Sequence, residues 1–272
     1  HLILSTDEYS EFLAESSANE LLIRKYVGGD EFINSRERYC LWLTDIQPDQ
    51  IRRSALILER LQRVKAFRLA SGRAATNKLA ATPGIFGEVR QPKGQYLLLP
   101  KVSSENREYM PIGFLPPTMI ANGSSLIVPN AGLLHFGVLQ SAMHMAWMRA
   151  VCGRLESRYQ YSAGIVYNNF PWPEPPSASA LGSVEAAAQA VLDARAQFPS
   201  ATLADLYDPL SMPAALLKAH QRLDALVDKA YGKPGLKAES ERVAFLFERY
   251  QSLCSLVPVA TDKPKHRVGD QT

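Results

Sequence analysis

The chain has 272 residues, 46% of them hydrophobic and 21% charged, so it can bury the core of one large domain or two ordinary ones. This balance excludes a chain that is disordered by composition. Because no run of about 18 apolar residues occurs, it also excludes a transmembrane helix, and no membrane partner is expected. The formal net charge is only +3, but residues 1–50 carry −6 and residues 51–107 carry +9.

The first half of the chain predicts short strands mixed with helices. Ser5 and Glu8 have the spacing of a capping box and predict a short helix that reaches about residue 16. Pro48 suits the first turn of a second helix, in which apolar residues at helical spacing continue to residue 70. Residues 71–86 are expected to be irregular. The predicted strands cover residues 21–27, 31–34, 39–44, 85–89, 96–102, 109–115, 125–128 and 164–167.

A change of composition divides the chain. A mostly apolar stretch, residues 133–154, predicts a buried helix and completes an α+β (mixed α/β) domain over residues 1–174. Residues 171–176 are rich in proline and predict a linker. A small all-α domain is expected over residues 177–256, with a flexible tail at 257–272. Its predicted helices cover residues 183–197, 213–231 and 236–256.

The charge is concentrated in one block. Residues 51–107 hold twelve Lys or Arg against three Asp or Glu, directly after the acidic residues 1–50. A basic block of this kind predicts a surface that faces a polyanion. A helix with a solvated basic face is the alternative, but the excess continues past the helix into the strands.

Residues 97–113 carry the most distinctive pattern. An apolar strand leads into a polar turn and a second strand follows, as in a hairpin loop on a rigid scaffold. The side chains of the turn are donors and acceptors of the kind that read base edges and hold phosphates. They are Lys101, Ser103, Ser104, Glu105, Asn106 and Arg107. A solvated hairpin with nothing bound is the alternative.

Two groups of titratable residues have simpler interpretations. His135, His144 and Cys152 are nine and eight residues apart and share no helix face, so no metal site is expected. His220 and Asp224 are four residues apart on a predicted helix and can pair, but no nucleophile accompanies them, so a surface or interface pair is expected.

No catalytic, cofactor-binding or metal-binding residue is predicted in this chain. Residues 168–173 read Asn-Asn-Phe-Pro-Trp-Pro, in which Pro and Phe are transposed relative to the Asn/Asp-Pro-Pro-aromatic motif of amino-methylating enzymes. We expect Phe170 and Trp172 to pack at a strand exit instead, and no Gly-rich nucleotide-binding motif occurs. Cys40, Cys152 and Cys254 are odd in number and widely spaced, which indicates reduced thiols in a cytoplasm.

Several runs of residues are similar to a known family. The runs are EFIN (31–34), RYCLWL (38–43), LPKVSSENREYMPIGF (99–114), FGVLQS (136–141), GRL (153–155) and YNNFPWP (167–173). They resemble the target recognition domain of MmeI-like enzymes. ADLYDP (204–209), Met212-Pro213 and Ala219-His220 resemble the helical C-terminal domain of the same family.

The resemblance implies a role in a larger protein. Members are type IIG/IIL restriction–modification proteins: an endonuclease, an adenine-N6 DNA methyltransferase that uses S-adenosylmethionine, and then the recognition part. This chain would carry only the recognition part. Its expected partners are double-stranded DNA and the upstream methyltransferase domain of the same polypeptide, and its cofactor would be bound upstream.

Within this resemblance the residues expected to contact DNA divide into two sets. The expected base-reading residues are Arg36, Arg38, Arg90, Lys93, Ser103, Ser104, Glu105, Asn106 and Arg107. The expected phosphate-holding residues are Arg53, Arg60, Arg63, Arg68, Arg73, Lys78 and Lys101. Arg107 suits guanine, Glu105 suits a cytosine amine and Asn106 suits adenine. A mutual ion pair of Glu105 and Arg107 that only shapes the loop is the alternative.

Two rival functions stay open from the sequence. The helical unit and basic surface could form a protein-interaction module that docks a partner subunit. Alternatively, the chain could be an independent methyltransferase, which would require that it bind S-adenosylmethionine itself.

Overall fold

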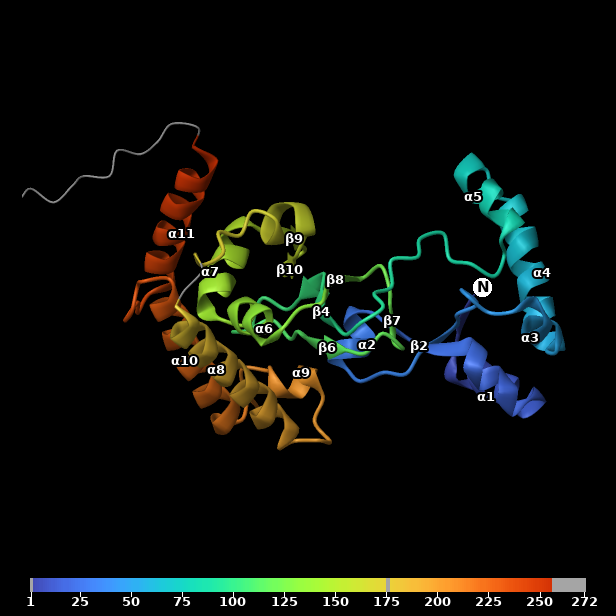
Figure 1. Ribbon diagram of the computed structural model, residues 1–272, viewed down its shortest axis with the longest axis horizontal. Coiled ribbons are helices and arrows are strands. Elements are labelled where there is room, and N and C mark those ends of the chain that lie inside the picture. Colours follow the sequence, from blue (N-terminus) through green and yellow to red (C-terminus); the bar gives the residue numbers. More distant parts are fainter. Residues whose placement is uncertain (1, 175–176, 256–272) are drawn as a thin grey trace, which may run out of the picture.

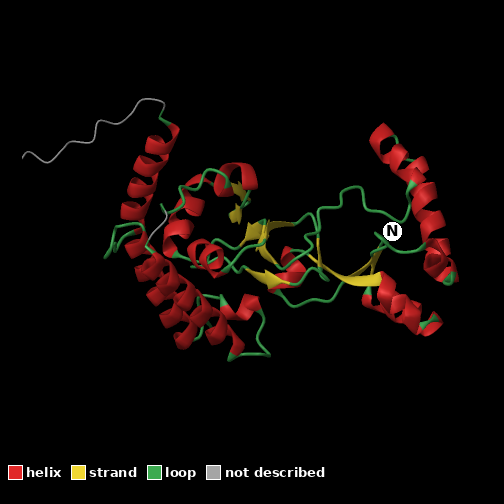
Figure 2. Cartoon of the chain, in the orientation of Figure 1, coloured by secondary structure: helices red, strands yellow, loops and turns green. Residues whose placement is uncertain are grey.

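The structure is a computed structural model that describes residues 2–174 and 177–255. The molecule is long, with helices at both ends and small sheets between them (Figures 1 and 2). This arrangement confirms the predicted mixture of strands and helices followed by an all-helical region.

The elements within the described residues are as follows. The helices are α1 (Thr6–Glu15), α2 (Gly29–Ile33), α3 (Pro48–Arg52), α4 (Ala55–Leu69), α5 (Ala74–Lys78), α6 (Leu133–Leu139), α7 (Ala142–Val151), α8 (Ala178–Ala196), α9 (Leu203–Leu206), α10 (Ala214–Ala230) and α11 (Glu239–Cys254). The strands are β1 (Ile3–Leu4), β2 (Ile23–Val27), β3 (Tyr39–Leu41), β4 (Tyr96–Pro100), β5 (Val102–Ser103), β6 (Gly113–Leu115), β7 (Ile120–Ala121), β8 (Ser125–Pro129), β9 (Gly153–Leu155) and β10 (Arg158–Gln160). Short 3-10 turns cover Ser17–Leu22 and Leu79–Ala81, and a π-helical turn covers Ala163–Tyr167.

One end of the molecule, here called the N-terminal lobe, contains α1, α3, α4 and α5 (Figure 1). The paired strands β1 and β3 belong to the same lobe, because their residues share its core. The predicted capping box is present, because Ser5 Oγ accepts from Glu8 N at 3.2 Å and the Glu8 carboxylate accepts from Ser5 N at 3.0 Å. The core of this lobe contains Leu4, Phe12, Leu41, Ile57 and Val64. Strand β2 joins the lobe to the middle of the molecule, because its first half pairs with β3 and its second half runs parallel to β7.

The predicted helix over residues 48–70 is two helices. Ser54 is fully buried and caps the second, its Oγ accepting from Ile57 N at 3.1 Å. This serine ends α3 and starts α4 where apolar spacing alone predicts continuity. Residues 31–33 belong to α2 and Asn34 follows its end, so no strand forms here, because the Glu31 carboxylate accepts from Gly28 N at 2.9 Å and caps a helical turn.

Residues 71–89 also differ from their prediction. The segment expected to be irregular contains α5 and the turn Leu79–Ala81, whereas the strand expected at 85–89 is not formed. Arg68 explains the second difference, because its guanidinium donates to the carbonyls of Leu79, Thr82 and Ile85, each at 2.8 Å. These hydrogen bonds hold residues 79–85 in turns, so this segment does not pair with a neighbouring strand.

Strand β4 is the centre of the molecule. It lies between β6 and β8, both antiparallel to it, and all its residues are buried. Leu97 and Leu99 belong to the core shared with the helical end, whereas Tyr96 and Leu98 belong to a smaller core under α2. Burial on both faces explains the unbroken apolar run.

The predicted hairpin is present, but its second strand is shorter. β4 pairs with β6 from Tyr96↔Leu115 to Leu98↔Gly113, so residues 109–112 lie outside the ladder. Gly113 permits a close approach here, since a Cβ at this position would lie 2.9 Å from Phe32 Cζ of α2.

A third sheet, β5-β10-β9, joins β5 to the two strands that follow the helix pair α6–α7. The predicted helix over 133–154 is broken at Gln140 and Ser141, and Ser141 caps α7 by accepting from His144 N at 3.4 Å. Residues 153–160 form the hairpin β9–β10, which the sequence analysis did not predict. The strand expected at 164–167 is the π-helical turn, capped by Ser162.

Helices α8, α10 and α11 form in the regions predicted for the small helical unit, and α8 begins five residues before its prediction. They pack against α6 and α7, and one hydrophobic core extends from Leu97 to Leu246. The division into domains at residues 174 and 177 therefore stays a prediction, and the expected tail and Pro175–Pro176 of the linker lie outside the described residues. Among the described residues, every helix is too short or too polar to cross a bilayer.

Candidate nucleic-acid interface

The polar turn lies beside the β9–β10 hairpin. β5 pairs with β10 through Ser103↔Tyr159, which places residues 104–107 next to the hairpin. We call residues 104–107 and 153–160 the loop–hairpin surface. Arg154 and Arg158 on this surface were not among the predicted site residues; Arg154 lies over the Tyr159 ring, with its Cζ 4.1 Å from the ring centre. The only signal for them in the sequence is a short polar run, Gly153 to Gln160, that reads as a tight hairpin.

The electrostatics of this surface keep Glu105 ionised. A hydrogen bond with the Ser157 side chain, helped by the positive charges of Arg154 and Arg158, lowers the pKa of the Glu105 carboxyl. In the described chain Glu105 makes no ion pair with Arg107, so the loop-shaping alternative is not supported. Burial lowers the pKa of Arg107, against the charge of Asp208, and this side chain lies half-buried while Asn106 is exposed.

The other predicted base-reading residues are spread over several loops. Arg36 pairs with Asp30 at 2.8 Å and Arg38 pairs with Glu31 at 3.1 Å, whereas Lys93 is exposed. Ser104 Oγ accepts from Asn106 N at 3.3 Å and shapes the loop. Ser103 is buried, so its side chain is removed from any groove contact in this conformation.

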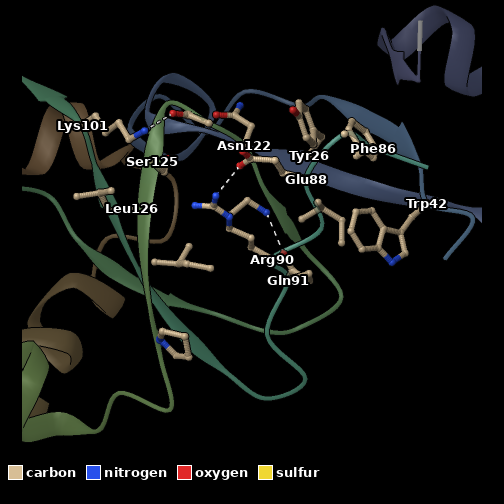
Figure 3. Close-up of a pocket in the computed structure, with 16 residues that line it drawn as sticks. Tyr26, Trp42, Phe86, Glu88, Arg90, Gln91, Lys101, Asn122, Ser125 and Leu126 are labelled. Carbon is tan, nitrogen blue, oxygen red and sulfur yellow. Dashed lines mark hydrogen bonds and ion pairs between the residues drawn. The ribbon is translucent and has the colours of Figure 1, made fainter. Parts of the chain in front are cut away.

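A cleft of about 620 Å³ lies between β2, the segment around residues 86–91 and the strands β7 and β8 (Figure 3). Tyr26, Phe86 and Trp42 form an aromatic wall, with ring centres 5.8 Å apart in both neighbouring pairs. Arg90, paired with Glu88 at 3.1 Å, lies between this wall and the side that carries Lys101. Aromatic faces beside cations suit bases and phosphates.

Of the predicted phosphate-holding residues, two are structural. Arg60 is 8% exposed, pairs with Glu8 and lies over the Phe12 ring, with its Cζ 5.9 Å from the ring centre. Arg68 is equally buried and holds the carbonyls described above. Because both hold the N-terminal lobe together, we correct their assignment and remove them from the phosphate set.

The remaining phosphate candidates are accessible. Arg53 and Arg63 make exposed pairs with residues one helical turn away, Asp49 and Glu59. Arg73 and Lys78, at the two ends of α5, are exposed, and Lys101 donates to the Gly123 carbonyl at 2.7 Å at the edge of the cleft. The structure does not bring the phosphate candidates and the loop–hairpin surface into one patch. Helices α4 and α5 lie at one end of the molecule, and the β9–β10 hairpin lies toward the other (Figure 1).

His220 is buried and Asp224 is half-buried, and the two side chains do not pair with each other. His220 Nε2 lies 2.9 Å from the Tyr207 hydroxyl and its ring stacks on Tyr109, with 3.9 Å between ring centres. Asp224 accepts from Tyr109 Oη and from Ala142 N, each at 2.7 Å. The predicted surface or interface pair is therefore wrong, because each of the two side chains bonds to another part of the fold.

His144 and the aromatic motif are also structural. His144 is buried 3.0 Å from the Tyr161 hydroxyl, and burial lowers its pKa to about 3, so its ring is neutral. Phe170 is buried and packs edge-on against Trp172, with ring centres 5.4 Å apart. This confirms the packing role, although the chain leaves a helical turn there rather than a strand.

These features define a recognition module: small sheets and packed helices hold polar loops and a cleft at the surface, as binding domains do. The chain belongs to the MmeI family, because residues 1–174 match the model of the MmeI target recognition domain and residues 178–257 match that of the MmeI C-terminal domain. The resemblance inferred from the sequence is thus confirmed. The comparisons give no support to the partner-docking alternative.

Two known proteins that are similar to this chain are longer than it is. It is 37% identical over 252 residues to DNA methyltransferase A of Bacillus subtilis (strain 168), covering 93% of this chain and 28% of that protein. It also matches a solved structure of the type IIL restriction-modification enzyme MmeI in complex with DNA. There the sequence identity is 46%, the TM-score is 0.89, and the match covers 93% of this chain and 34% of that one. The chain therefore spans about a third or less of either relative.

Proposed function

We propose that this chain reads the DNA target of a restriction–modification methyltransferase and holds the duplex in register for adenine-N6 methylation. The loop–hairpin surface carries the proposal, since it presents polar side chains beside a two-stranded ribbon in a chain similar to an enzyme solved with DNA. A two-stranded ribbon fits the major groove, where each base pair offers a distinct pattern of donors and acceptors.

On this proposal the loop makes the base contacts. Asn106 is exposed and suits adenine, and the ionised Glu105 suits a cytosine amine. Arg107 would contact guanine after turning out of its half-buried position. Arg154 and Arg158 join the reading set because they flank Glu105. Arg36, Arg38, Arg90 and Lys93 would approach the duplex from the neighbouring loops.

The accessible cations would hold the phosphates. Arg53, Arg63, Arg73 and Lys78 lie on the N-terminal lobe, and Lys101 lies at the cleft, between that lobe and the loop–hairpin surface. Such contacts fix the position of the protein on the duplex without carrying sequence information.

The chemistry would belong to the upstream part of the parent protein. A methyltransferase that acts on an adenine amino group must take the base out of the stack, so another part must hold the neighbouring pairs. S-adenosylmethionine would be bound in that upstream domain. The three cysteines are free thiols, as suits a cytoplasmic protein.

The test is a binding selection with the parent protein. The parent protein would be mixed with duplexes that carry a randomised ten-base-pair window, at each of a series of salt concentrations. The bound duplexes would then be sequenced. We expect one enriched motif and affinity that falls steeply with salt. Binding that ignores salt and enriches no motif would overturn the proposal and favour a protein partner instead.

A further inference from the structure

The segment that follows the polar turn lies in no sheet. Residues 104–112 fall outside every strand that the structure describes. Buried backbone carbonyls need hydrogen-bond partners, and a segment without a neighbouring strand must find them elsewhere. Met110 and Ile112 are 2% and 0% exposed, so their carbonyls require hydrogen-bond partners within the protein.

The partners are side chains from the helical end of the molecule. Arg149 of α7 donates through Nη2 to the carbonyls of Glu108, at 2.8 Å, and Arg107, at 3.2 Å. Gln140, between α6 and α7, donates to the Met110 carbonyl. Arg195 of α8 donates through Nη1 to the Ile112 carbonyl at 2.7 Å.

These contacts fall on alternate residues of the segment. The carbonyls of Glu108, Met110 and Ile112 each accept from a different side chain, so three side chains act as the hydrogen-bond donors that a neighbouring strand would otherwise supply. Between them, Tyr109 donates to Asp224 of α10 at 2.7 Å and stacks on His220.

Each of these donors is itself held in place by a further side-chain contact. Arg195 Nη2 donates to Gln140 Oε1 at 3.0 Å, and Arg195 Nε donates to the Tyr207 hydroxyl at 2.7 Å. Arg149 is held by Glu239 of α11 at 2.6 Å. The network thus ties four helices, α7, α8, α10 and α11, to one short segment.

We propose that the helices at this end of the molecule, α7, α8, α10 and α11, form a clamp that sets the conformation of the DNA-reading loop, with Arg149, Gln140 and Arg195 as positioning residues for sequence discrimination. A loop held in one conformation loses little entropy on binding and tolerates wrong base pairs poorly, whereas a loose loop adapts to them. The role in discrimination rests on the proposed function; the ordering of the loop does not.

Arg149→Ala tests the clamp, and Arg249→Ala is its matched control. Arg249, on α11, is similarly half-buried and also pairs with an acid, Glu174, but its donors reach the Trp172 carbonyl, away from the loop. Both variants would be made in the parent protein, with thermal unfolding measured for each. Arg149 lies at the surface, with 22% of its side chain exposed, so the variant is expected to fold.

Two measurements separate the clamp from a general loss of stability. Amide hydrogen exchange should become faster in residues 104–112 of Arg149→Ala and stay unchanged there in Arg249→Ala. In the random-duplex selection, Arg149→Ala should lose discrimination about tenfold at one or more positions, the size of one base contact, while its affinity for unselected duplex stays the same. Arg149→Lys can donate to one of the two carbonyls. Its exchange rate and its discrimination should therefore lie between those of the wild type and those of Arg149→Ala.

Each outcome decides between the claims. Unchanged exchange in residues 104–112 of Arg149→Ala would overturn the clamp, as would equal effects of the two alanine variants. If exchange rises but discrimination does not, the helices order the loop without setting specificity, and the proposal fails in that part. If the wild-type protein itself enriches no motif, the proposed function fails, and the exchange experiment still decides whether the clamp exists.

Discussion

Asp224 connects three parts of the molecule through one carboxyl group. One oxygen accepts from Tyr109 in the loop segment, and the other accepts from the Ala142 amide at the start of α7. Burial raises the pKa of Asp224 from 3.8 to about 6, although both hydrogen bonds oppose the shift. The folded protein therefore binds a proton here at pH values where the unfolded chain has already released it.

This carboxyl predicts a pH dependence of stability. Between about pH 4 and 6 the folded state binds more protons at Asp224 than the unfolded state, so the free energy of unfolding falls as the pH rises. The slope from this group alone is at most about 1.4 kcal/mol per pH unit. Asp224→Asn removes the titration but keeps the shape of the side chain. Urea unfolding at pH 4.5, 5.5 and 7 should show the wild type losing stability relative to the variant as the pH rises, and parallel curves would contradict the assignment.

At the loop, Asn106 offers a test of base reading that does not disturb the fold. Its side chain is exposed, so Asn106→Ala should leave thermal unfolding unchanged. In the parent protein we expect it to reduce the preference for adenine at one position by about 1–3 kcal/mol, because a bidentate contact is lost. The control is Asn168→Ala. Asn168 is also exposed, but it follows the β9–β10 hairpin in the chain and lies outside the loop–hairpin surface. If both variants select the same motif as the wild type, Asn106 reads no base.

At the scale of elements, two serines decide where helices break. Apolar spacing predicts single helices over residues 48–70 and 133–154, and in both cases a buried serine in the middle caps a second helix. Ser54 and Ser141 could have been noticed as N-cap residues, but periodicity does not show whether a serine faces solvent or accepts from the backbone.

Other parts of the fold and site were accessible from sequence to different degrees. The β4–β6 hairpin, the capping box at Ser5 and the helices α8, α10 and α11 follow from local patterns. The burial of Arg60 and Arg68 does not, because a charged residue reads as exposed until its partners, Glu8 and the carbonyls after α5, are placed in space. The hairpin β9–β10 was missed for the same reason, since its neighbour β5 is about fifty residues earlier in the chain.

Ser54 predicts a measurable stability effect at the junction of α1 and α4. Its hydroxyl bonds to the Glu15 carboxylate, accepts from Ile57 N at 3.1 Å and accepts from Asn19 Nδ2 at 3.4 Å. Ser54→Ala should cost about 1–2 kcal/mol of unfolding free energy, because it removes a cap and leaves buried polar groups without a partner. The control is Ser10→Ala, at an exposed serine of α1, and should change it by less than about 0.5 kcal/mol. Urea unfolding measures both, and equal values would show that the cap is not needed.

On the proposed function, the helical end and the N-terminal lobe would have different tasks on the same duplex. The helical end shares its core with β4 and contacts the loop segment, whereas the lobe carries exposed cations on α4 and α5 at the far end (Figure 1). A long molecule can contact phosphates at one end and bases toward the other only if the duplex extends along it. The two kinds of contact should therefore respond to mutation independently.

The salt dependence of DNA binding tests this separation. Arg73→Ala and Lys78→Ala, on α5, should each weaken binding to every duplex sequence and reduce the slope of log affinity against log salt by about 0.9, the value for one lost phosphate contact. The motif recovered from random duplexes should not change, because these residues touch no base edge. Lys229→Ala, which removes an exposed charge from α10, is the control and should alter neither quantity.

Arg60→Ala completes the comparison, because Arg60 is buried beside Glu8 and Phe12. It should lower the thermal stability of the N-terminal lobe and leave the salt slope of the folded protein unchanged. A reduced slope in Arg60→Ala without a loss of stability would return this residue to the phosphate set. Unchanged slopes in both α5 variants would mean that the duplex does not reach the N-terminal lobe, and that the loop–hairpin surface and the cleft bind it alone.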